Sequence, residues 1–319
     1  MPSIHAALVE KLGEPPRYRS LAEPHADART ELVDVLAVGV HPVTRAAASG
    51  RHYTSTDRLP MVPGVDGVVR RADGSLAFVA ARTTGTMAER IVIDPARAIP
   101  VPAGADPAVV AATMNPLMSS WVVLRARVPF VAGQSVLVLG ATGNAGSMAV
   151  KVARHLGAGR IIAAGRNQTR LDALLAEGAD DVVALTSDAG ATAEALAEAA
   201  ADVDVVLDYV WGAASEHAMR AILPARTDPA RVLDWVEIGS TGGSTIELDG
   251  ASLRSHALRI SGSGFGSVPL AVYGRELPEA AAAIASGALV VQPRVFALAD
   301  IEQAWAYVDR PGERTVIVP

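Results

Sequence analysis

QSVLVLGATGNAGSMAVKVARHLGA, residues 134–158, reads as a buried strand, a glycine-rich turn and a helix in immediate succession. The apolar run at 136–139 has no helical spacing and lies between Gly133 and Gly140, which is typical of a parallel strand that is buried on both faces. The helix expected at 147–156 has apolar residues on one face. This order of elements is how a nucleotide-binding α/β fold begins.

The turn within this stretch has the small residues of a dinucleotide-binding loop. Ala141, Gly143 and Gly146 occupy the three positions of a G-x-G-x-x-G fingerprint, with alanine in place of the first glycine. We expect Gly143 to let the backbone approach a pyrophosphate and Gly146 to let the helix pack close to the strand, with the free N–H groups of the helix start facing the anion. The loop residues expected to contact the cofactor are Ala141, Thr142, Gly143, Asn144, Ala145 and Gly146.

A glycine-bearing turn is often only a turn, so the next strand is needed to support a cofactor site. That strand is expected at 160–165, RIIAAG, and ends at Gly165. An NAD-binding fold usually has Asp or Glu about 20 residues past the glycines to hold the ribose 2′-OH. Here Arg166 follows instead, and together with Arg170 it can pair with a 2′-phosphate, which favours NADP(H). The alternative is that Arg166 is a solvated arginine at a strand end.

Composition limits the class of protein. A length of 319 residues is enough for about two domains, and the charged fraction of 19% is ordinary for a globular chain. A net charge of −6 without a Lys/Arg run argues against a nucleic-acid partner. The chain has no cysteine, no 18-residue apolar segment that predicts a bilayer crossing, and no signal-peptide pattern at its start. We therefore expect a cytoplasmic protein without a membrane partner.

The first part of the chain, residues 1 to about 118, has the β-branched and alternating residues of short strands, separated by Gly, Pro and Asp. We expect a small antiparallel barrel or sandwich with strands at 4–9, 31–40, 67–71, 76–80 and 89–93. A helical pattern at 108–127 then leads into the second domain.

Beyond the glycine-rich turn, helices and strands alternate as a doubly wound parallel sheet requires. Helices are expected at 168–177, 191–201 and 213–223, and strands at 181–185, 203–209, 232–239 and 257–262. A polar loop is expected at 226–231, and the tail after 263 should contain two helices and a closing strand. The predicted fold class is α/β, a doubly wound parallel sheet with a second, β-rich domain.

Five segments follow one another in the order of a known family: AVGVHPVT at 37–44, PGVDGVV at 63–69, the block at 134–158, LGAGRII at 156–162 and DIEQAWAYVDRPGERTVIVP at 300–319. Over nearly its whole length the chain resembles the medium-chain dehydrogenase/reductases, and within them the zinc-free, zeta-crystallin-like quinone oxidoreductases. The resemblance implies a GroES-like substrate domain built from 1–118 and 265–319. It also implies a Rossmann domain at 119–264 that binds NADP(H).

The chain differs from the zinc-dependent members of that family at their metal ligands. The resemblance places His41, Val65 and Asn115 at the three ligand positions. One imidazole with a valine and an amide does not hold catalytic zinc, which needs about three protein ligands. Without a Lewis acid, oxidation of an alcohol is hard to support, whereas hydride can add directly to a quinone or another electron-poor double bond.

The resemblance also implies cofactor contacts outside the glycine-rich turn. Ser119 matches a hydroxyl beside the nicotinamide ring, and the alternative is a hydroxyl satisfied by its own helix. Ser240, Gly264 and Phe265 match backbone contacts to the nicotinamide half, and the alternative is a glycine-rich turn without a ligand. Arg314 matches a basic residue that reaches the cofactor, and the alternative is a surface arginine.

On the substrate side, the resemblance implies that His41, Tyr53 and Asn115 stabilise a substrate oxygen. Histidine can donate a proton or a hydrogen bond near neutral pH, but a structurally satisfied histidine is the alternative. Tyr53 resembles the family's loop tyrosine, although its loop is one residue longer than the usual pattern. Asn115 can also shape the turn before Pro116, and Asp66 is interpreted as a brace for its loop.

Three functions agree with these residues. The leading hypothesis is an NADPH-dependent, zinc-independent reductase of quinones or activated enones. An enoyl-thioester reductase and a weakly catalytic NADPH-binding or redox-sensing protein are the alternatives. The family often forms homodimers by joining the edges of two Rossmann sheets, so a homodimer is an expectation of the resemblance.

Overall fold

The computed structural model describes residues 2–80 and 85–319. The chain divides into two compact units. Unit 1 contains Met1–Asn115 and Gly274–Pro319, and unit 2 contains Pro116–Tyr273. The domain borders expected from the sequence lay at 118/119 and 264/265, so the first observed border comes three residues earlier (115 against 118) and the second nine residues later (273 against 264).

Unit 2 contains a six-stranded sheet in which every neighbouring pair is parallel, in the order β10-β9-β8-β11-β12-β13. Its strands are β8 (Ser135–Leu139), β9 (Arg160–Gly165), β10 (Asp181–Ala184), β11 (Val205–Asp208), β12 (Leu233–Glu237) and β13 (Leu258–Gly262). This is the strand order of a Rossmann sheet. The predicted fold class is confirmed, and the strand expected at 160–165 has the observed bounds.

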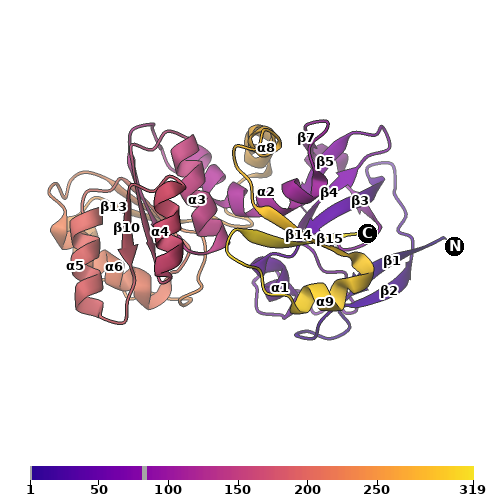
Figure 1. Cartoon of the computed structure of the whole chain (residues 1–319), viewed down its shortest axis with the longest axis horizontal. Coiled ribbons are helices and arrows are strands. Elements are labelled where there is room, and N and C mark those ends of the chain that lie inside the picture. Colours follow the sequence, from indigo (N-terminus) through magenta and orange to yellow (C-terminus); the bar gives the residue numbers. More distant parts are fainter. Residues whose placement is uncertain (1, 81–84) are drawn as a thin grey trace. The chain divides into compact units, whose positions relative to one another are not determined.

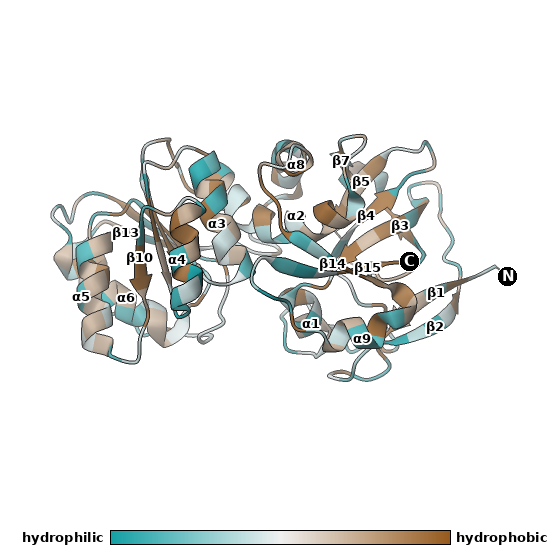
Figure 2. Cartoon of the chain, viewed as in Figure 1, coloured by the Kyte–Doolittle hydropathy of each residue, from teal (hydrophilic) through white to brown (hydrophobic). Residues whose placement is uncertain are grey.

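Helices cover both faces of this sheet. They are α3 (Asn144–His155), α4 (Gln168–Ala176), α5 (Ala189–Ala200), α6 (Gly212–Ala225) and the short α7 (Gly250–Ser255). Figure 1 shows α3 and α4 on one side of the strands and α5 and α6 on the other. Strand β10 is brown in Figure 2, as expected for a strand whose apolar side chains face helices on both sides.

The longest helical segment crosses the border between the units. Helix α2 (Pro107–Val122) continues without a break into a π-helical turn, η2 (Val123–Arg127). Together, Pro107–Arg127 is long and apolar enough to cross a membrane, and 72% of its apolar window is buried inside the fold. The sequence prediction that no segment has this length and apolarity was wrong, but a buried core helix has the same properties.

Unit 1 is built on a mixed seven-stranded sheet in the order β14-β15-β3-β4-β5-β7, with β6 also paired to β3, and on a two-stranded sheet of β1 and β2. The strands are β1 (Ser3–Leu8), β2 (Arg17–Ala22), β3 (Glu31–Gly39), β4 (Asp66–Arg70), β5 (Leu76–Ala80), β6 (Arg90–Ile93), β7 (Ile99–Val101), β14 (Gln292–Ala297) and β15 (Glu313–Val318). The helices are α1 (Pro42–Ala48), α9 (Ile301–Ala306) and α8 (Leu270–Ala285), which begins in unit 2 and continues into unit 1. The 3-10 turns are η1 (Pro95–Arg97) and η3 (Leu298–Asp300). Strand β14, teal in Figure 2, was not predicted.

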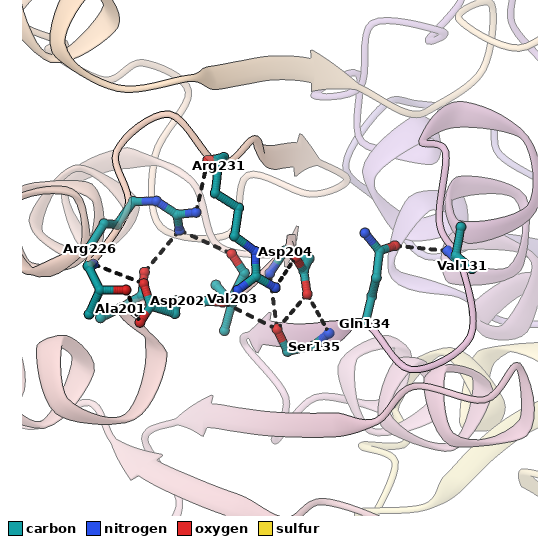
Figure 3. Close-up of polar contacts among 10 residues, drawn as sticks. Val131, Gln134, Ser135, Ala201, Asp202, Val203, Asp204, Arg226 and Arg231 are labelled. Carbon is teal, nitrogen blue, oxygen red and sulfur yellow. Dashed lines mark hydrogen bonds and ion pairs between the residues drawn. The ribbon is translucent and has the colours of Figure 1, made fainter.

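At the amino ends of β8 and β11 a polar network ties the strands of unit 2 to the loop before β12 (Figure 3). Asp204 accepts hydrogen bonds at 2.8 Å from both the backbone N–H and the hydroxyl of Ser135, and it pairs with Arg231. The guanidinium of Arg226 donates to the carbonyls of Val203 and Arg231, at 3.1 and 3.0 Å. Arg226 was expected in a polar loop, but it is only 7% exposed because these carbonyls surround it.

Candidate functional site

The topology of unit 2 marks where a ligand binds. From β8 the chain moves outward to β9 and β10, and then returns to β11 on the other side of β8 before moving outward again to β12. In open parallel sheets, ligands bind outside the carboxyl ends of the strands where the order reverses in this way. The segments at this point are the glycine turn after β8 and the loop after β11.

The glycine turn has the backbone that a dinucleotide requires. Gly140 adopts a φ of +83°, which favours glycine, so it makes the sharp turn that the fingerprint normally assigns to the position held here by Ala141. A Cβ atom on Gly146 would lie 2.7 Å from the Cα atom of Ala141, so only glycine allows α3 to pack this close to the strand. Gly143 is the N-cap of α3 and offers no side chain to the N–H groups of the helix start.

Of the two fingerprint glycines, Gly143 has open space beside it for a phosphate, whereas Gly146 does not. A Cβ atom on Gly143 would meet only the carbonyl oxygen of Gly140, at 3.6 Å. The side of the turn that faces outward at Gly143 is therefore open, and the helix dipole of α3 favours an anion there. This geometry fits the pyrophosphate of a dinucleotide.

The end of β9 carries the residues predicted to select the cofactor. A Cβ atom on Gly165 would come within 2.9 Å of the Thr142 hydroxyl, so Gly165 allows the glycine turn and the β9 end to pack together. Arg166 is exposed, and among residues 2–80 and 85–319 it makes no hydrogen bond or ion pair. Arg170 is different, because its guanidinium donates to both carboxylate oxygens of Glu177.

Glu177 is shared between two cations. Besides Arg170, the Nζ atom of Lys151 lies 3.0 Å from the Glu177 carboxylate. The hydrogen bond from Arg170 is the largest cause that lowers the pKa of Glu177 below its usual value. The Arg170 guanidinium therefore points toward the carboxyl-terminal end of α4, away from the helix start where Arg166 lies.

Ser119 meets a residue that the sequence did not single out. Its hydroxyl donates to the carbonyl of Pro116 at 2.8 Å, in its own helix, and lies 2.9 Å from the hydroxyl of Tyr209. Tyr209 directly follows β11 and is 9% exposed. Burial raises the pKa of the Tyr209 phenol to about 12, and its hydrogen bonds with Ser119 and Ser120 lower it by less. The contact joins residues 90 positions apart, so no local pattern predicts it.

The loop after β12 is hydrogen-bonded to the loop after β11. The hydroxyl of Thr241 donates to the carbonyl of Tyr209 at 3.0 Å, and the backbone N–H of Gly242 donates to the carbonyl of Val210 at 2.6 Å. Ser240, a predicted cofactor contact, precedes Thr241 and is exposed. These bonds link the loop that carries Ser240 to the switch point.

Gly264 and Phe265 follow β13, on the other side of β12. The backbone N–H of Gly264 is already used within its own loop, because it donates to the hydroxyl of Ser267 at 2.8 Å. Phe265 is 39% exposed. Both residues lie at the carboxyl edge of the sheet, and their predicted contacts with the cofactor stay predictions.

A buried carboxylate that sequence reasoning missed shapes the β11 end. Oδ1 of Asp208 accepts the N–H groups of Val210 and Trp211, each at 2.9 Å, and Oδ2 accepts the indole N–H of Trp235 at 2.8 Å. These bonds stabilise Trp211 at φ +54°, a left-handed conformation that is unusual for a bulky residue. An aspartate at the end of an apolar run is typical of a turn in which the carboxylate binds the following backbone N–H groups, so this role of Asp208 could have been predicted from the sequence.

Unit 1 brings together two of the predicted substrate-side residues. His41 and Asp66 are each 1% exposed at the side chain, with Nε2 of His41 at 3.4 Å from Oδ1 of Asp66. Asn115 donates its amide to Oδ2 of Asp66 at 2.6 Å. Gly39 makes room for the imidazole, since a Cβ atom there would lie 2.7 Å from Cε1 of His41. Asp66 is thus the centre of a buried polar cluster.

The donor set of this cluster does not fit a catalytic zinc ion. His41 is its one imidazole, Val65 offers no donor atom, and the amide of Asn115 is bonded to Asp66. The chain has no cysteine. Among the residues that the structure describes, no group of three or more His, Cys, Asp or Glu side chains is placed to hold a metal ion.

Two further predicted residues lie in unit 1. Tyr53 is 71% exposed in the loop after α1, with its ring 4.2 Å from that of His52. Arg314 is 6% exposed, and its guanidinium donates to the carbonyl of Val40 at 3.2 Å and to Asp309 at 2.7 Å. Burial lowers the pKa of Arg314 below its usual value. A solvated surface arginine is therefore the wrong alternative for Arg314, whereas its contact with the cofactor stays a prediction.

The switch point of unit 2, with its glycine turn and open helix start, defines a Rossmann-fold dinucleotide-binding protein. Residues 145–286 match the family model described as zinc-binding dehydrogenase. A probable NADPH-dependent quinone reductase, tdiC of Emericella nidulans, is 30% identical over 361 residues, covering 99% of this chain and 100% of that protein. The chain therefore belongs to the quinone oxidoreductase family of the medium-chain dehydrogenase/reductases.

Solved structures agree with this family. The quinone oxidoreductase of Thermus thermophilus, described in complex with NADPH, is 25% identical with a TM-score of 0.79, over 99% of this chain and 100% of that one. An alcohol dehydrogenase superfamily protein from Novosphingobium aromaticivorans is 25% identical with a TM-score of 0.80, over 99% of each chain.

Proposed function

We propose that this chain is an NADPH-dependent reductase of quinones or activated enones that works by direct hydride transfer without zinc. The observation that carries the proposal is the full-length relation to a protein named as an NADPH-dependent quinone reductase. The donor set around Asp66 supports the zinc-independent part, because valine replaces one ligand and an amide bonded to Asp66 replaces another.

NADP(H) is the cofactor, and two features of unit 2 support the proposed contacts with its pyrophosphate and with its separate ribose 2′-phosphate. The open side of Gly143 and the start of α3 suit the pyrophosphate. Arg166 is exposed at the β9 end without a protein partner in the described chain, so its guanidinium is available to a 2′-phosphate. Arg170 is held by Glu177, and we propose that Arg166 makes the main contact.

When bound, NADPH supplies the hydride, and the chain orients it and stabilises charge. We propose that Ser119, Ser240, Gly264 and Phe265 contact the nicotinamide half. Hydride addition to one end of a quinone or enone leaves negative charge on its oxygen, and one proton completes the product. We propose that the hydroxyl of Tyr53 donates to this oxygen.

His41 and Asn115 differ from Tyr53 because both contact the buried carboxylate of Asp66. Both lie in the cluster around Asp66, where His41 is 1% exposed. We propose that the His41 imidazole, held beside the Asp66 carboxylate, supplies the proton after substrate binding, and that Asn115 keeps Asp66 in place. These two assignments predict that the His41→Gln variant reduces the substrate more slowly than the wild type.

The test is a steady-state assay of NADPH oxidation with a quinone, an α,β-unsaturated ketone and an enoyl thioester, each repeated with NADH. We expect turnover with the quinone and the enone, faster with NADPH. Metal analysis of the active protein should find no stoichiometric zinc, and a chelator should not lower the rate. Thioester turnover above quinone turnover would instead favour an enoyl-thioester reductase, and NADPH binding without turnover would favour a sensing role.

We also propose a cytoplasmic homodimer. Its support is the resemblance of the sequence to a family that often dimerises, together with a cysteine-free composition. Light scattering on the purified chain measures the first part, and cell fractionation measures the second.

A further inference from the structure

Tyr209 contacts three segments that meet at the switch point. Its side chain reaches Ser119 on α2, and its backbone carbonyl accepts the hydroxyl of Thr241, which follows Ser240 after β12. It also packs against the glycine turn, because a Cβ atom on Gly140 would lie 3.3 Å from the Tyr209 Cβ atom. One residue is thus linked to the turn after β8, to α2 and to the loop after β12, and only its contact with α2 uses the phenol hydroxyl.

The direction of the hydrogen bond between the two hydroxyls follows from proton counting. Ser119 has one hydroxyl proton, and it is donated to the carbonyl of Pro116 at 2.8 Å. Tyr209 must therefore donate to Ser119. A phenol pKa of about 12, raised by burial, keeps this proton in place over the whole working range. The result is a fixed chain from Tyr209 through Ser119 to the Pro116 carbonyl.

We propose that Tyr209 is a positioning residue for the nicotinamide end of the cofactor, and that it acts by holding the hydroxyl of Ser119 in one rotamer. The proposal rests on the proposed function for the identity of the ligand. Its own evidence is the place of Tyr209 at the strand reversal and its contacts with three cofactor-side segments. A phenylalanine at 209 keeps the ring and removes only the donor.

A double-mutant cycle on the full chain tests this coupling. The variants are Tyr209→Phe, Ser119→Ala and both together, with kcat and KM measured for NADPH oxidation by a quinone. Each single change should lower kcat/KM about fivefold, the factor that corresponds to one net hydrogen bond. The double variant should be no worse than Ser119→Ala alone, because Tyr209 acts only through Ser119.

Two readouts separate positioning from a loss of fold. With NADPH deuterated at the transferred position, the isotope effect on kcat should rise in Tyr209→Phe, since a misplaced ring makes hydride transfer more rate-limiting. Tyr307→Phe is the matched control: Tyr307 donates to Glu313 at 2.8 Å in unit 1, and its removal should leave the isotope effect unchanged. Independent losses that multiply in the double variant would overturn the proposal.

The emission spectrum of bound NADPH separates this proposal from the proposed function. The nicotinamide ring is the fluorophore, so the spectrum reports its surroundings without any turnover. If the wild-type chain binds NADPH but reduces no quinone or enone, the proposed function fails. The inference then stands if Tyr209→Phe and Ser119→Ala shift the emission alike, and it fails if Tyr209→Phe leaves the spectrum unchanged or if the wild type binds no NADPH.

Discussion

The Nδ2 atom of Asn115 lies 2.6 Å from the Oδ2 atom of Asp66, and the two residues are 49 positions apart in the chain. Asp66 is fully buried, so the amide provides this oxygen with a hydrogen bond that solvent does not supply. The bond links β4 to α2 within unit 1. It also fixes the carboxylate that faces His41.

Asn115→Ala should therefore destabilise the chain, because it leaves a buried carboxylate oxygen without its donor. We expect a loss of about 1–3 kcal/mol in the free energy of unfolding, measured in urea. The matched control is Gln168→Ala, which removes an exposed amide that donates to Asp172 at 2.7 Å and should cost under about 0.5 kcal/mol. Equal losses in the two variants would contradict the assignment of Asp66 as a buried, bonded charge.

Two glycines of the fingerprint should respond differently to the same added methyl group. Gly146→Ala forces backbone atoms of Gly140 and Ala141 to move, so we expect a loss of about 1–3 kcal/mol in unfolding free energy. Gly143→Ala meets only one atom at 3.6 Å, and its φ of −81° suits alanine. This variant should keep its stability within about 0.5 kcal/mol and lose NADPH affinity, measured by fluorescence titration. A stable Gly143→Ala variant with wild-type affinity would show that the phosphate binds elsewhere.

Arg166→Ala should change cofactor preference and not stability. Loss of a charge-assisted hydrogen bond predicts about a tenfold or greater fall in NADPH affinity, with NADH affinity unchanged. Arg170→Ala is the companion variant: it breaks the Arg170–Glu177 ion pair, so it should lower the melting temperature and change the preference less. The assignment fails if the ratio of the NADPH and NADH dissociation constants stays the same in Arg166→Ala.

The lowered pKa of Asp204 predicts that the stability of the fold depends on pH. Burial raises its pKa, but hydrogen bonds from Ser135 and Arg231 lower it by more, so the net shift in the folded state is downward. A lowered folded pKa stabilises the fold above the unfolded value, about 3.9, and this contribution disappears as pH falls through the folded value. Asp204→Asn should cost about 2 kcal/mol at pH 7 and much less near pH 3, in urea unfolding at each pH. A cost that is independent of pH would exclude an ionised Asp204 as the cause.

The alternating half of the fold could be predicted because its central strands β8, β9 and β11 are short apolar runs. Strand β9 has the predicted bounds, and β8 was recognised from the run 136–139. Strands β2 and β14 could not be found this way, because each has an exposed, polar face and is defined by its partner strand. Helix α1 was missed although Pro42 stands at a first-turn position, a local signal that was available.

The candidate site likewise contains some residues that could be predicted from the sequence and others that could not. The glycine turn and Arg166 could be found because their chemistry follows directly from strand ends in the sequence. Tyr209 could not, since its role comes from a contact with Ser119 across 90 positions. Asp66 was interpreted only as a brace, because burial beside His41 is a tertiary property. Sequence patterns locate backbone turns, whereas pairs of distant side chains need the folded chain.

The network around Asp204 and Arg226 lies at the amino ends of β8 and β11, whereas the glycine turn and Tyr209 follow the carboxyl ends of the same strands. Substitutions at the two edges of the sheet should therefore lower cellular activity for different reasons. Those beside Arg226 change how much folded protein accumulates, and those beside Tyr209 change what each molecule does. In a library of random variants, expression yield and specific activity should sort the two groups without any further structure.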